Sequence, residues 1–505
     1  MLKQLSLVLL CIIVSFNVLS IGATKNPHYV GHRTTMVHLF EWKWNDIANE
    51  CEKFLGPKGF GGVQVSPIQE NVIIPNRPWY ERYQPISYKW STRSGNEQEF
   101  RSMVRRCNKA GVRIYVDAVL NHMTGNHEKA VGTGGSTADP HKFSYPAVPF
   151  ERKHFNEPCG IDYNNAKTVR DCELVGLHDL NQRLDHVRKQ MIAFLNKAID
   201  AGVAGIRIDA AKHMWPEDLK YIYSKLKNLN VEHGFPPNSR PFIFQEVIDY
   251  GGESISKFEY NEFAAVLEFK HGRELCNGIR GQNPLKYFKT WGTTWGLLPS
   301  DDAVTFVDNH DTQREGFMTP LTYREFRLYK MAVAFMLAHP YGHPRVMSSY
   351  DFKGFEQGPP ADEYGNILSP ISAEGTCSNG WVCEHRWRQI YNMVGFRNHV
   401  GKAPMKRWWD NGNGQVAFCR GDVGFFAINT ENSDLRRKLR TCLPAGTYCD
   451  VISGELRNGR CTGHSIEVDA QGNAQIEILT SRHDGVVAYH TGAKVGKNKH
   501  HPNQL

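Results

Sequence analysis

The chain has 505 residues, of which 41% are hydrophobic and 22% charged. This is the composition of an ordinary globular protein and excludes a disordered or fibrous chain. Lysine and arginine number 60 and aspartate and glutamate 52, which gives a net charge of +8 at neutral pH. The basic residues are spread along the chain, apart from a mild cluster at 494–501. We therefore expect no nucleic-acid partner.

Residues 1–23 have the pattern of a secretory signal peptide. Lys3 precedes an apolar run over 5–19, and small residues follow at 20, 22 and 23. A membrane anchor is the alternative, but the run is shorter than the roughly 20 residues that span a bilayer. No later segment is long and apolar enough for a span. The sequence thus predicts a secreted, extracellular protein without a membrane partner.

The cysteines predict disulfides. The chain has 12 cysteines, and Cys11 lies within the predicted signal peptide. The others pass through an oxidising route, where disulfides form, and their odd number leaves at least one thiol over. Three pairs are close enough in sequence for local disulfides: Cys159 with Cys172, Cys377 with Cys383, and Cys449 with Cys461.

Apolar runs that alternate with amphipathic stretches predict a parallel sheet covered by helices. The helical spacing is clear at Val187, Met191, Phe194, Leu195 and Ile199. Such alternation over most of the chain favours a closed (β/α)₈ TIM barrel, built from residues 24–120 and 181–415. The segments predicted as strands are 35–40, 62–66, 112–119, 203–209, 241–247, 304–308 and 345–348.

Two regions do not fit the barrel pattern. Residues 121–180 are rich in Gly, Pro, Asn and His and lack a strong helix, which predicts an inserted irregular domain after the third strand. Residues 416–492 contain short alternating runs with Gly and Asn turns, which predict a C-terminal antiparallel β-sandwich domain. Residues 493–505 are expected to form a basic tail.

Acidic residues follow three of the predicted strands. Asp209, Glu246 and Asp311 come at the ends of the fourth, fifth and seventh strands, where barrel enzymes place their active sites. A single carboxylate at such a position often caps the next helix. Three at one rim, with arginine and histidine beside them, instead indicate acid/base chemistry. Paired carboxylates suit glycosyl transfer, in which one attacks the anomeric carbon and the other protonates the leaving oxygen.

The residues around these acids resemble a known family. The segments VDAVLNH, GIRIDAAKH, FQEVID and FVDNHD are similar to the four sequence blocks of the α-amylase family of glycoside hydrolases. Flanking segments such as HLFEWKW, NRPWYERYQP and LAHPYGHPRVMSSY resemble the secreted animal members. The likeness runs from about Val37 to Tyr489, nearly the whole chain after the predicted signal peptide.

This resemblance implies roles for individual residues. Asp209 matches the nucleophile, Glu246 the acid/base and Asp311 the carboxylate that stabilises the transition state. The positions that match substrate-binding residues are Trp79, Tyr80, Tyr83, Gln84, His122, Arg207, Lys212, His213 and His310. An aromatic run such as the one at 79–83 can also belong to the core, but the charged Glu81 and Arg82 favour an exposed rim.

The resemblance also implies two ions. Side chains of Asn121 and Asp179, with backbone carbonyls of Arg170 and His213, match the oxygen ligands of one structural Ca²⁺. Without the resemblance, a helix cap and a backbone hydrogen bond would explain the two side chains. Arg207, Asn309 and Arg345 match the ligands of one activating Cl⁻. A salt bridge or a backbone contact is the alternative for Arg345.

Family disulfides match Cys51–Cys107, Cys159–Cys172, Cys377–Cys383 and Cys449–Cys461. Cys276, Cys419 and Cys442 are left, and the last two could pair within the β domain. The sequence departs from the family after FVDNHD, where many animal members have a glycine-rich loop. Here Gly316 is the only glycine in DTQREGFMTPLTYREF, so we expect a cleft that is more open on the leaving-group side.

The sequence therefore predicts a secreted endo-acting α-amylase that hydrolyses internal α-1,4-glucosidic bonds of starch, glycogen and maltooligosaccharides with retention of configuration. An exo-acting α-glucosidase or transglycosylase of the same fold is one alternative. A catalytically silent carbohydrate-binding barrel is the other, although such chains usually lose the acids. The expected partner is an α-glucan, and the chain is expected to be a monomer. Whether protein inhibitors bind the cleft stays open.

Overall fold

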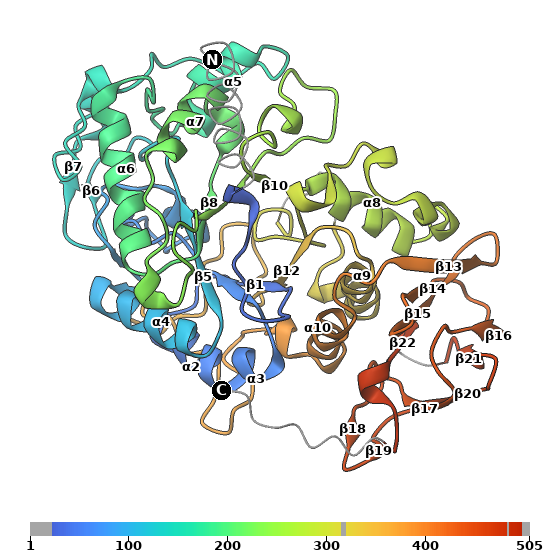
Figure 1. The fold of residues 1–505 in the computed structure, drawn as a ribbon. Coiled ribbons are helices and arrows are strands. Elements are labelled where there is room, and N and C mark those ends of the chain that lie inside the picture. The colour runs from blue at the N-terminus through green and yellow to red at the C-terminus, as the bar shows by residue number, and fades with distance from the viewer. Residues whose placement is uncertain (1–22, 315–319, 482–483, 497–505) are drawn as a thin grey trace, which may run out of the picture.

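Eight parallel strands close into a barrel at the centre of the molecule (Figure 1). We describe a computed structural model, which covers residues 23–314, 320–481 and 484–496. The barrel order is β1-β12-β11-β10-β9-β8-β5-β2. These strands are β1 (Met36–Leu39), β2 (Gly62–Gln64), β5 (Arg113–Ala118), β8 (Gly205–Ile208), β9 (Phe242–Gln245), β10 (Ala265–Leu267), β11 (Ala303–Thr305) and β12 (His343–Ser348). The predicted TIM barrel is confirmed, and the strand that the sequence did not show is β10.

Helices surround the barrel and bury their apolar faces against it. In the sixteen-residue α6, the positions buried include Val187, Met191, Phe194, Leu195 and Ile199, as their spacing predicts. The helices are α2 (Trp44–Glu50), α3 (Gly56–Lys58), α4 (Glu97–Lys109), α5 (Ala166–Asp171), α6 (Asp185–Asp200), α7 (Pro216–Ser224), α8 (Phe269–Ile279), α9 (Phe326–Ala338) and α10 (Arg388–Val400). None in the described part of the chain is long and apolar enough to cross a membrane.

The segment between β5 and α6 is irregular, as predicted. Its regular elements are short: β6 (Ala130–Val131), β7 (Thr137–Ala138), α5 and several turns of 3₁₀ helix. The hairpin β3 (Ser91–Thr92) and β4 (Gly95–Asn96) lies earlier, between β2 and α4. In Figure 1 the inserted segment lies at the far end of the barrel from the C-terminal domain.

The C-terminal domain is an antiparallel sandwich. A four-stranded sheet, β13-β14-β15-β22, encloses an apolar core together with the pairs β16-β21 and β17-β20. Its strands are β13 (Met405–Asp410), β14 (Gln415–Arg420), β15 (Gly424–Asn429), β16 (Leu435–Arg440), β17 (Gly446–Cys449), β18 (Leu456–Arg457), β19 (Arg460–Cys461), β20 (Ser465–Val468), β21 (Asn473–Ile478) and β22 (Val486–His490). Because β13 pairs with β14, the sheet begins at Met405, earlier than the expected start at 416.

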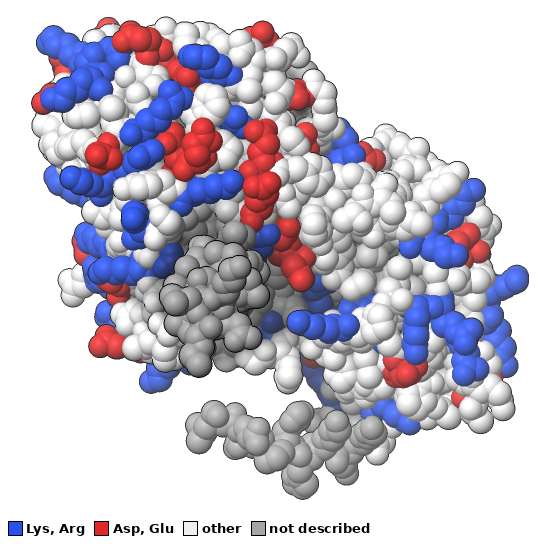
Figure 2. Space-filling view, turned by 45° about the horizontal axis from the view of Figure 1, so that its top comes forward, with Lys and Arg blue, Asp and Glu red and all other residues white. Residues whose placement is uncertain are grey.

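Side-chain hydrogen bonds hold this domain against the barrel. Arg420 Nη1 donates to the carbonyl of Ala338 at 2.6 Å, and Arg388 Nε donates to that of Ile452 at 3.0 Å. On the face of the molecule that Figure 2 shows, basic and acidic side chains are interspersed over the described residues.

Five disulfides are present in the described residues. The four that match the family are confirmed, and Cys419 also pairs with Cys442. Cys276 is a buried free thiol. The predicted signal peptide (1–22 of it) and the segment 315–319, where the sequence departs from the glycine-rich loop, lie outside the described residues.

Candidate functional site

The barrel register places two of the predicted catalytic acids side by side. Ile208 at the end of β8 pairs with Gln245 at the end of β9, so Asp209 and Glu246 leave neighbouring strands at the same level. Both are largely buried, with 7% and 8% of their surface exposed. The amide of Ala210 donates to Glu246 Oε2 at 2.8 Å and fixes that carboxyl toward Asp209. The fold therefore brings the pair together at the carboxyl end of the barrel.

One guanidinium lies between three carboxyls. Arg207 Nη1 is 2.6 Å from Asp117 Oδ1 and 2.8 Å from Asp209 Oδ1, and its Nη2 is 2.8 Å from Glu246 Oε1. Burial raises the pKa of Asp209 well above its usual range, the Arg207 charge opposes this, and the Glu246 charge adds to it. Burial also raises the pKa of Asp117, and the Arg207 charge opposes this shift. This is an environment for proton transfer.

Asp311 comes to the same rim from β11. Its amide donates to Asn309 Oδ1 at 3.1 Å, and His310 Nε2 lies 3.4 Å from its Oδ2. The His310 ring is stacked on Tyr83 with centroids 5.1 Å apart and on Phe40 at 4.8 Å. Burial lowers the pKa of His310 well below its usual value, so this ring is neutral. Asp311 has more access to solvent than the other two acids, with 21% of its side chain exposed.

The aromatic residues of the segment 79–83, which we call the aromatic wall, are more buried than the charged residues among them predict. Trp79 and Tyr83, in a 3₁₀ turn at Trp79–Tyr83, are only 6% and 9% exposed. Glu81 and Arg82 do not mark an exposed rim, because they point inward; Arg82 Nη1 pairs with Glu41 Oε2 at 2.7 Å. That expectation was wrong, and the reason is ion pairing inside the protein.

A later loop covers the outer side of this wall. Trp79 Nε1 donates to the carbonyl of Phe355 at 2.9 Å, and the hydroxyl of Tyr80 donates to Glu356 Oε1 at 3.2 Å. Gln84 Oε1 accepts a hydrogen bond from the amide of Gly125 at 3.2 Å, which joins the wall to the inserted domain.

Of the remaining predicted substrate contacts, His122 adjoins the aromatic wall, and Lys212 and His213 follow β8 after Asp209. His122 Nε2 is 2.9 Å from the carbonyl of Tyr83, and burial lowers the pKa of His122 to about 4. His213 Nδ1 is 2.8 Å from the carbonyl of Val169. Lys212 Nζ donates to the carbonyl of Ile248 at 3.0 Å and pairs with Glu253. Burial lowers the pKa of His213 to about 4 as well. The rings of His122 and His213 are therefore neutral at pH 7.

Two of the three predicted chloride ligands, Arg207 and Arg345, carry buried donors without acceptors. Arg345 Nη1 donates to Gln64 Oε1 at 2.6 Å, while Arg345 Nη2, Gln64 Nε2 and Arg207 Nε are buried without hydrogen-bond partners. Within the described residues Arg345 forms no ion pair, and burial lowers its pKa to about 10. Asn309 follows β11, and its Oδ1 accepts hydrogen bonds from the amides of Asp311 and Thr312 at 3.1 and 2.7 Å. A buried cation surrounded by unpaired donors fits an anion.

The predicted calcium ligands carry unpaired acceptor oxygens, whereas the predicted chloride ligands carry unpaired donors. Asn121 Oδ1 and Asp179 Oδ1 are buried without hydrogen-bond partners, and a backbone bridge joins Asp179 to His122, next to Asn121. The His213 ring contacts the carbonyl of Val169, the residue before Arg170. The backbone carbonyls predicted as ligands, those of Arg170 and His213, therefore belong to adjoining segments. No cluster of three His, Cys, Asp or Glu side chains occurs in the described regions, so amide and carbonyl oxygens must complete such a site. Unpaired oxygens of this kind fit a hard cation.

Comparison with known proteins identifies the family of this chain. "Alpha amylase, catalytic domain" matches residues 53–240, and "Alpha amylase, C-terminal all-beta domain" matches residues 408–492. An alpha-amylase-related protein of Drosophila melanogaster is 58% identical over 476 residues, which cover 94% of this chain and 96% of the relative. The chain belongs to the α-amylase family. A second alpha-amylase-related protein, from Drosophila atripex, is 56% identical over 98% of this chain and all of that protein.

Solved structures agree with this family assignment. Wild-type α-amylase I of the earthworm Eisenia fetida superposes with a TM-score of 0.87 and 42% identity, covering 92% of this chain and 98% of that one. A variant of the earthworm enzyme, solved as a maltohexaose complex, matches with the same TM-score of 0.87 at 41% identity. The chain therefore has an α-amylase-type glycoside hydrolase fold over nearly its whole length.

Several residues of this site were not assigned a role from the sequence. Asp117 shares Arg207 with the predicted nucleophile and accepts a hydrogen bond from the Tyr83 hydroxyl at 3.0 Å. Gln64 holds Arg345, and Glu253 pairs with Lys212. The position of Asp117 at the end of the third predicted strand was a usable signal. Gln64 and Glu253 act through contacts with distant segments and carry no local pattern.

Proposed function

We propose that this chain is a secreted endo-acting α-amylase, which hydrolyses internal α-1,4-glucosidic bonds of starch, glycogen and maltooligosaccharides with retention of anomeric configuration. One observation carries the proposal: Arg207 contacts Asp209 and Glu246 through its two Nη atoms, each at 2.8 Å. A retaining pair lies about 5 Å apart, because one acid must reach the anomeric carbon while the other reaches the leaving oxygen. Two acids held on one guanidinium support this close spacing.

In the first step, Asp209 attacks the anomeric carbon and forms a glycosyl ester, while Glu246 gives its proton to the glycosidic oxygen. The C–O bond to the leaving sugar breaks, and its electron pair stays on that oxygen. In the second step, Glu246 takes a proton from water, whose oxygen attacks the same carbon and releases Asp209. Asp311 binds sugar hydroxyls and stabilises the oxocarbenium-like transition state. The substrate side of the rim would be formed by Trp79 and Tyr83 with His122 and His310, and by Lys212 with His213.

The two ions have distinct supporting roles in this proposal. Ca²⁺, held by Asn121, Asp179 and the carbonyls of Arg170 and His213, would link the inserted domain to the barrel. Cl⁻, held by Arg207, Asn309 and Arg345, would supply negative charge near the acids. Their supporting observations are the unpaired oxygens of Asn121 and Asp179 and the unpaired donors of Arg207 and Arg345.

The test is hydrolysis of a long maltooligosaccharide with and without chloride, with product lengths and anomers followed by NMR. We expect mid-chain cuts, α-anomers as first products, and a higher rate with chloride. Glucose released only from one end would support the exo-acting alternative. No turnover in the presence of calcium and chloride, with retained binding of the sugar, would support the silent carbohydrate-binding barrel. Equal rates with and without halide would remove the chloride site from the proposal.

A further inference from the structure

A buried side-chain hydrogen bond closes the turn that carries Asp311. Asp308, which follows β11, is 1% exposed, and its Oδ2 accepts a hydrogen bond from Gln313 Nε2 at 2.6 Å. These two residues are five positions apart, and His310 and Asp311 lie between them. The bond therefore joins the two ends of the short segment 309–312, which we call the Asp311 turn.

Hydrogen bonds inside the Asp311 turn fix its shape. The amides of Asp311 and Thr312 donate to Asn309 Oδ1 at 3.1 and 2.7 Å. The amide of Asn309 donates to Thr312 Oγ1 at 3.1 Å, and the amide of Gln313 donates to the carbonyl of Asn309 at 3.1 Å. Because these bonds are local, they shape the turn but do not set its position relative to the barrel.

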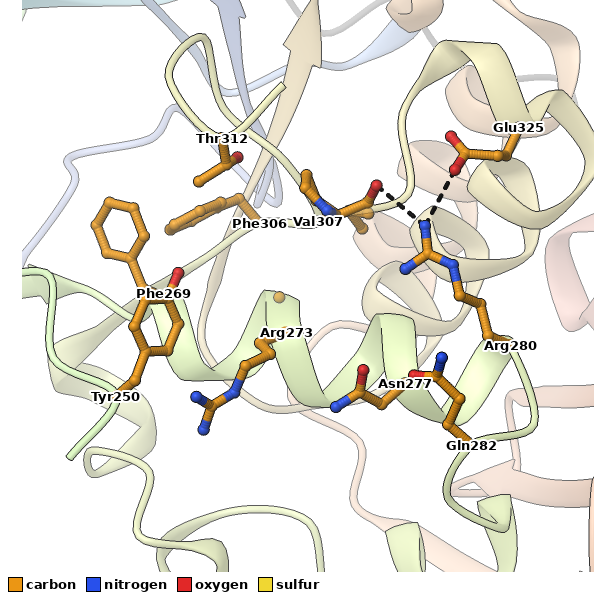
Figure 3. A pocket seen from close by; sticks show the side chains of 12 residues that line it. Tyr250, Phe269, Arg273, Asn277, Arg280, Gln282, Phe306, Val307, Thr312 and Glu325 are labelled. Carbon is orange, nitrogen blue, oxygen red and sulfur yellow. Dashed lines mark hydrogen bonds and ion pairs between the residues drawn. The ribbon is translucent and has the colours of Figure 1, made fainter. Parts of the chain in front are cut away.

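One side of the segment that follows β11 faces a cavity (Figure 3). The cavity has a volume of about 500 Å³, and Phe306, Val307 and Thr312 line it opposite helix α8. This side of the segment lacks the close packing that holds a buried chain in place. The position of the Asp311 turn must therefore be set from its other sides.

Two other elements hold the base of the turn through Asp308 and Gln313. From α9, the hydroxyl of the fully buried Tyr329 donates to Asp308 Oδ1 at 3.1 Å. Directly after β12, Ser349 Oγ accepts a hydrogen bond from Gln313 Nε2 at 2.6 Å, and the amide of Ser349 donates to Glu384 Oε2 at 2.7 Å. Asp308 is thus the residue through which β11, α9 and the far end of the turn are joined.

The aromatic wall gives a separate support to the middle of the turn. Arg314 Nη1 donates to the carbonyl of His310 at 2.7 Å, and the His310 ring is stacked on Tyr83 and Phe40. This support acts on His310, whereas Asp308 acts on both ends of the turn. Loss of Asp308 should therefore displace the turn without removing it from the rim.

We propose that Asp308 is a positioning residue for Asp311, which it holds in place relative to the other two acids through Gln313 and Tyr329. The inference rests on the proposed function, in which Asp311 stabilises the transition state, and it adds a residue that has no assigned role in that reaction. A catalytic group that is displaced by about 1 Å can lose about 10²-fold in rate. A residue that positions Asp311 should thus affect kcat strongly although it does not touch the sugar.

The first test compares two replacements of Asp308. Asp308→Leu removes the acceptor of Gln313 and Tyr329, so kcat on a long maltooligosaccharide should fall about 10²-fold while KM changes little. Asp308→Asn keeps an acceptor oxygen and has amide hydrogens for the Tyr329 oxygen. Burial raises the pKa of Asp308 to about 8, so its side chain is mainly neutral at pH 7, as asparagine is. This conservative variant should therefore keep kcat near the wild-type value.

A double-mutant cycle separates positioning from a purely structural role. Because Asp308 acts through Asp311, Asp308→Leu should lower kcat no further once Asp311→Asn is present. Full additivity of the two losses would overturn the proposal. Glu268→Gln is the matched control, since Glu268 is a fully buried acid that follows the neighbouring strand β10 and pairs with Lys257 at 2.6 Å. This control should keep kcat near wild type.

Hydrogen–deuterium exchange tests the proposal without turnover. Gln313→Met removes the same bond with a side chain of similar size, and it serves as the test variant where Asp308→Leu does not fold. The amides of Asp311 and Thr312 should exchange about tenfold faster in either variant, because the base of the turn has lost a buried hydrogen bond. Asp308→Asn and Glu268→Gln should exchange as wild type does. Unchanged exchange in Gln313→Met would overturn the proposal.

The outcomes distinguish this inference from the proposed function. A wild-type protein that hydrolyses no glucan would refute the amylase, and exchange of the Asp311 turn would then decide the role of Asp308. Wild-type turnover with an unchanged kcat in Asp308→Leu and Gln313→Met would refute the positioning role and leave the amylase proposal intact. Equal losses of kcat in Asp308→Leu and Asp308→Asn would show that the charge of Asp308 is what matters, which contradicts the proposal.

Discussion

Two acids, Asp308 of the barrel and Asp469 of the C-terminal sandwich, have opposite surroundings. Asp308, next to β11, is buried, and this burial raises its pKa to about 8. Asp469, in the turn before β21, is partly exposed; the backbone amide of Asn473 and then Lys438 lower its pKa to about 2. The barrel keeps carboxyls away from water at its functional end, while the sandwich uses a carboxyl to close a turn.

From this difference we expect the acids of the barrel rim to determine activity and the acid of the sandwich to affect stability. Buried acids that share one cation at a rim are arranged for chemistry, and replacing one of them changes the reaction more than the fold. A turn-closing acid contributes only to its local structure. Changes at the barrel rim should therefore reduce activity without unfolding the protein, and changes in the sandwich should do the reverse.

The largest expected effect is at the paired acids of the rim. Glu246→Gln should reduce kcat on a long maltooligosaccharide by about 10²–10⁴-fold, the usual contribution of a positioned proton donor. Asp209→Asn should reduce it further, because the covalent route is lost. Initial rates and thermal melts would be measured together, with Asp469→Asn as the control from the sandwich. Retained activity in either rim variant would contradict the assignment of that residue.

The converse effect is expected from the disulfide inside the sandwich. Cys419 and Cys442 are 23 residues apart, so replacing both by alanine should lower the free energy of unfolding by about 3 kcal/mol. The catalytic acids lie in another domain, so kcat at 25 °C should stay near the wild-type value. Denaturant unfolding and initial rates check the two parts. A fall in kcat equal to that of a rim variant would show that the sandwich and the barrel are not separable in this way.

A smaller stability effect is expected from calcium. A ligand that binds only the folded state at about 100 times its Kd adds about 2.7 kcal/mol to stability. Complete removal by a strong chelator should lower the melting temperature accordingly. Asp179→Asn should make the melt much less sensitive to the chelator, since a buried anionic ligand is lost. An unchanged wild-type melt, with metal removal verified by elemental analysis, would exclude a structural Ca²⁺.

The sequence predicted the barrel and its acids because both depend on local patterns. Buried strands are short apolar runs, and catalytic side chains follow them directly, as Asp209 follows β8. The strand β10 was missed, although β2 and β11 are equally short and were predicted, because no polar candidate site residue was recognised after it. Strand β13 was missed because its side chains are mostly exposed or half-buried, so its sequence lacks alternation.

Contacts between distant segments were beyond such patterns. Glu81 and Arg82 read as surface residues, yet each is 1% exposed. The partner of Arg82 is Glu41, and the loop over Trp79 comes from Phe355. Pairing of this kind depends on which loops meet, and side-chain polarity alone does not reveal it.

The last expected effect concerns the pH dependence of stability and arises at Glu384, a second buried acid of the barrel. Burial raises its pKa to about 7, against the ordinary value of 4.5, and its charge also raises the pKa of Asp308. Between these two pH values the folded protein holds a proton that the unfolded chain has released. Stability is thus greatest below about pH 4.5 for this group and is lost as the pH rises through about 7.

Glu384→Gln should reduce this alkaline loss, because glutamine cannot ionise and keeps an oxygen for the amide of Ser349, now bonded at 2.7 Å. Melting temperatures at pH 5 and pH 8 measure the effect, which should be roughly 2 °C for each kcal/mol in a large domain. Asp469→Asn is the matched control. The pKa of Asp469 is lowered to about 2, so its contribution is lost only on acidification below its ordinary value of 3.8. That variant should lose as much stability between pH 5 and pH 8 as wild type; an equal loss in Glu384→Gln would show that the buried acid is not the cause.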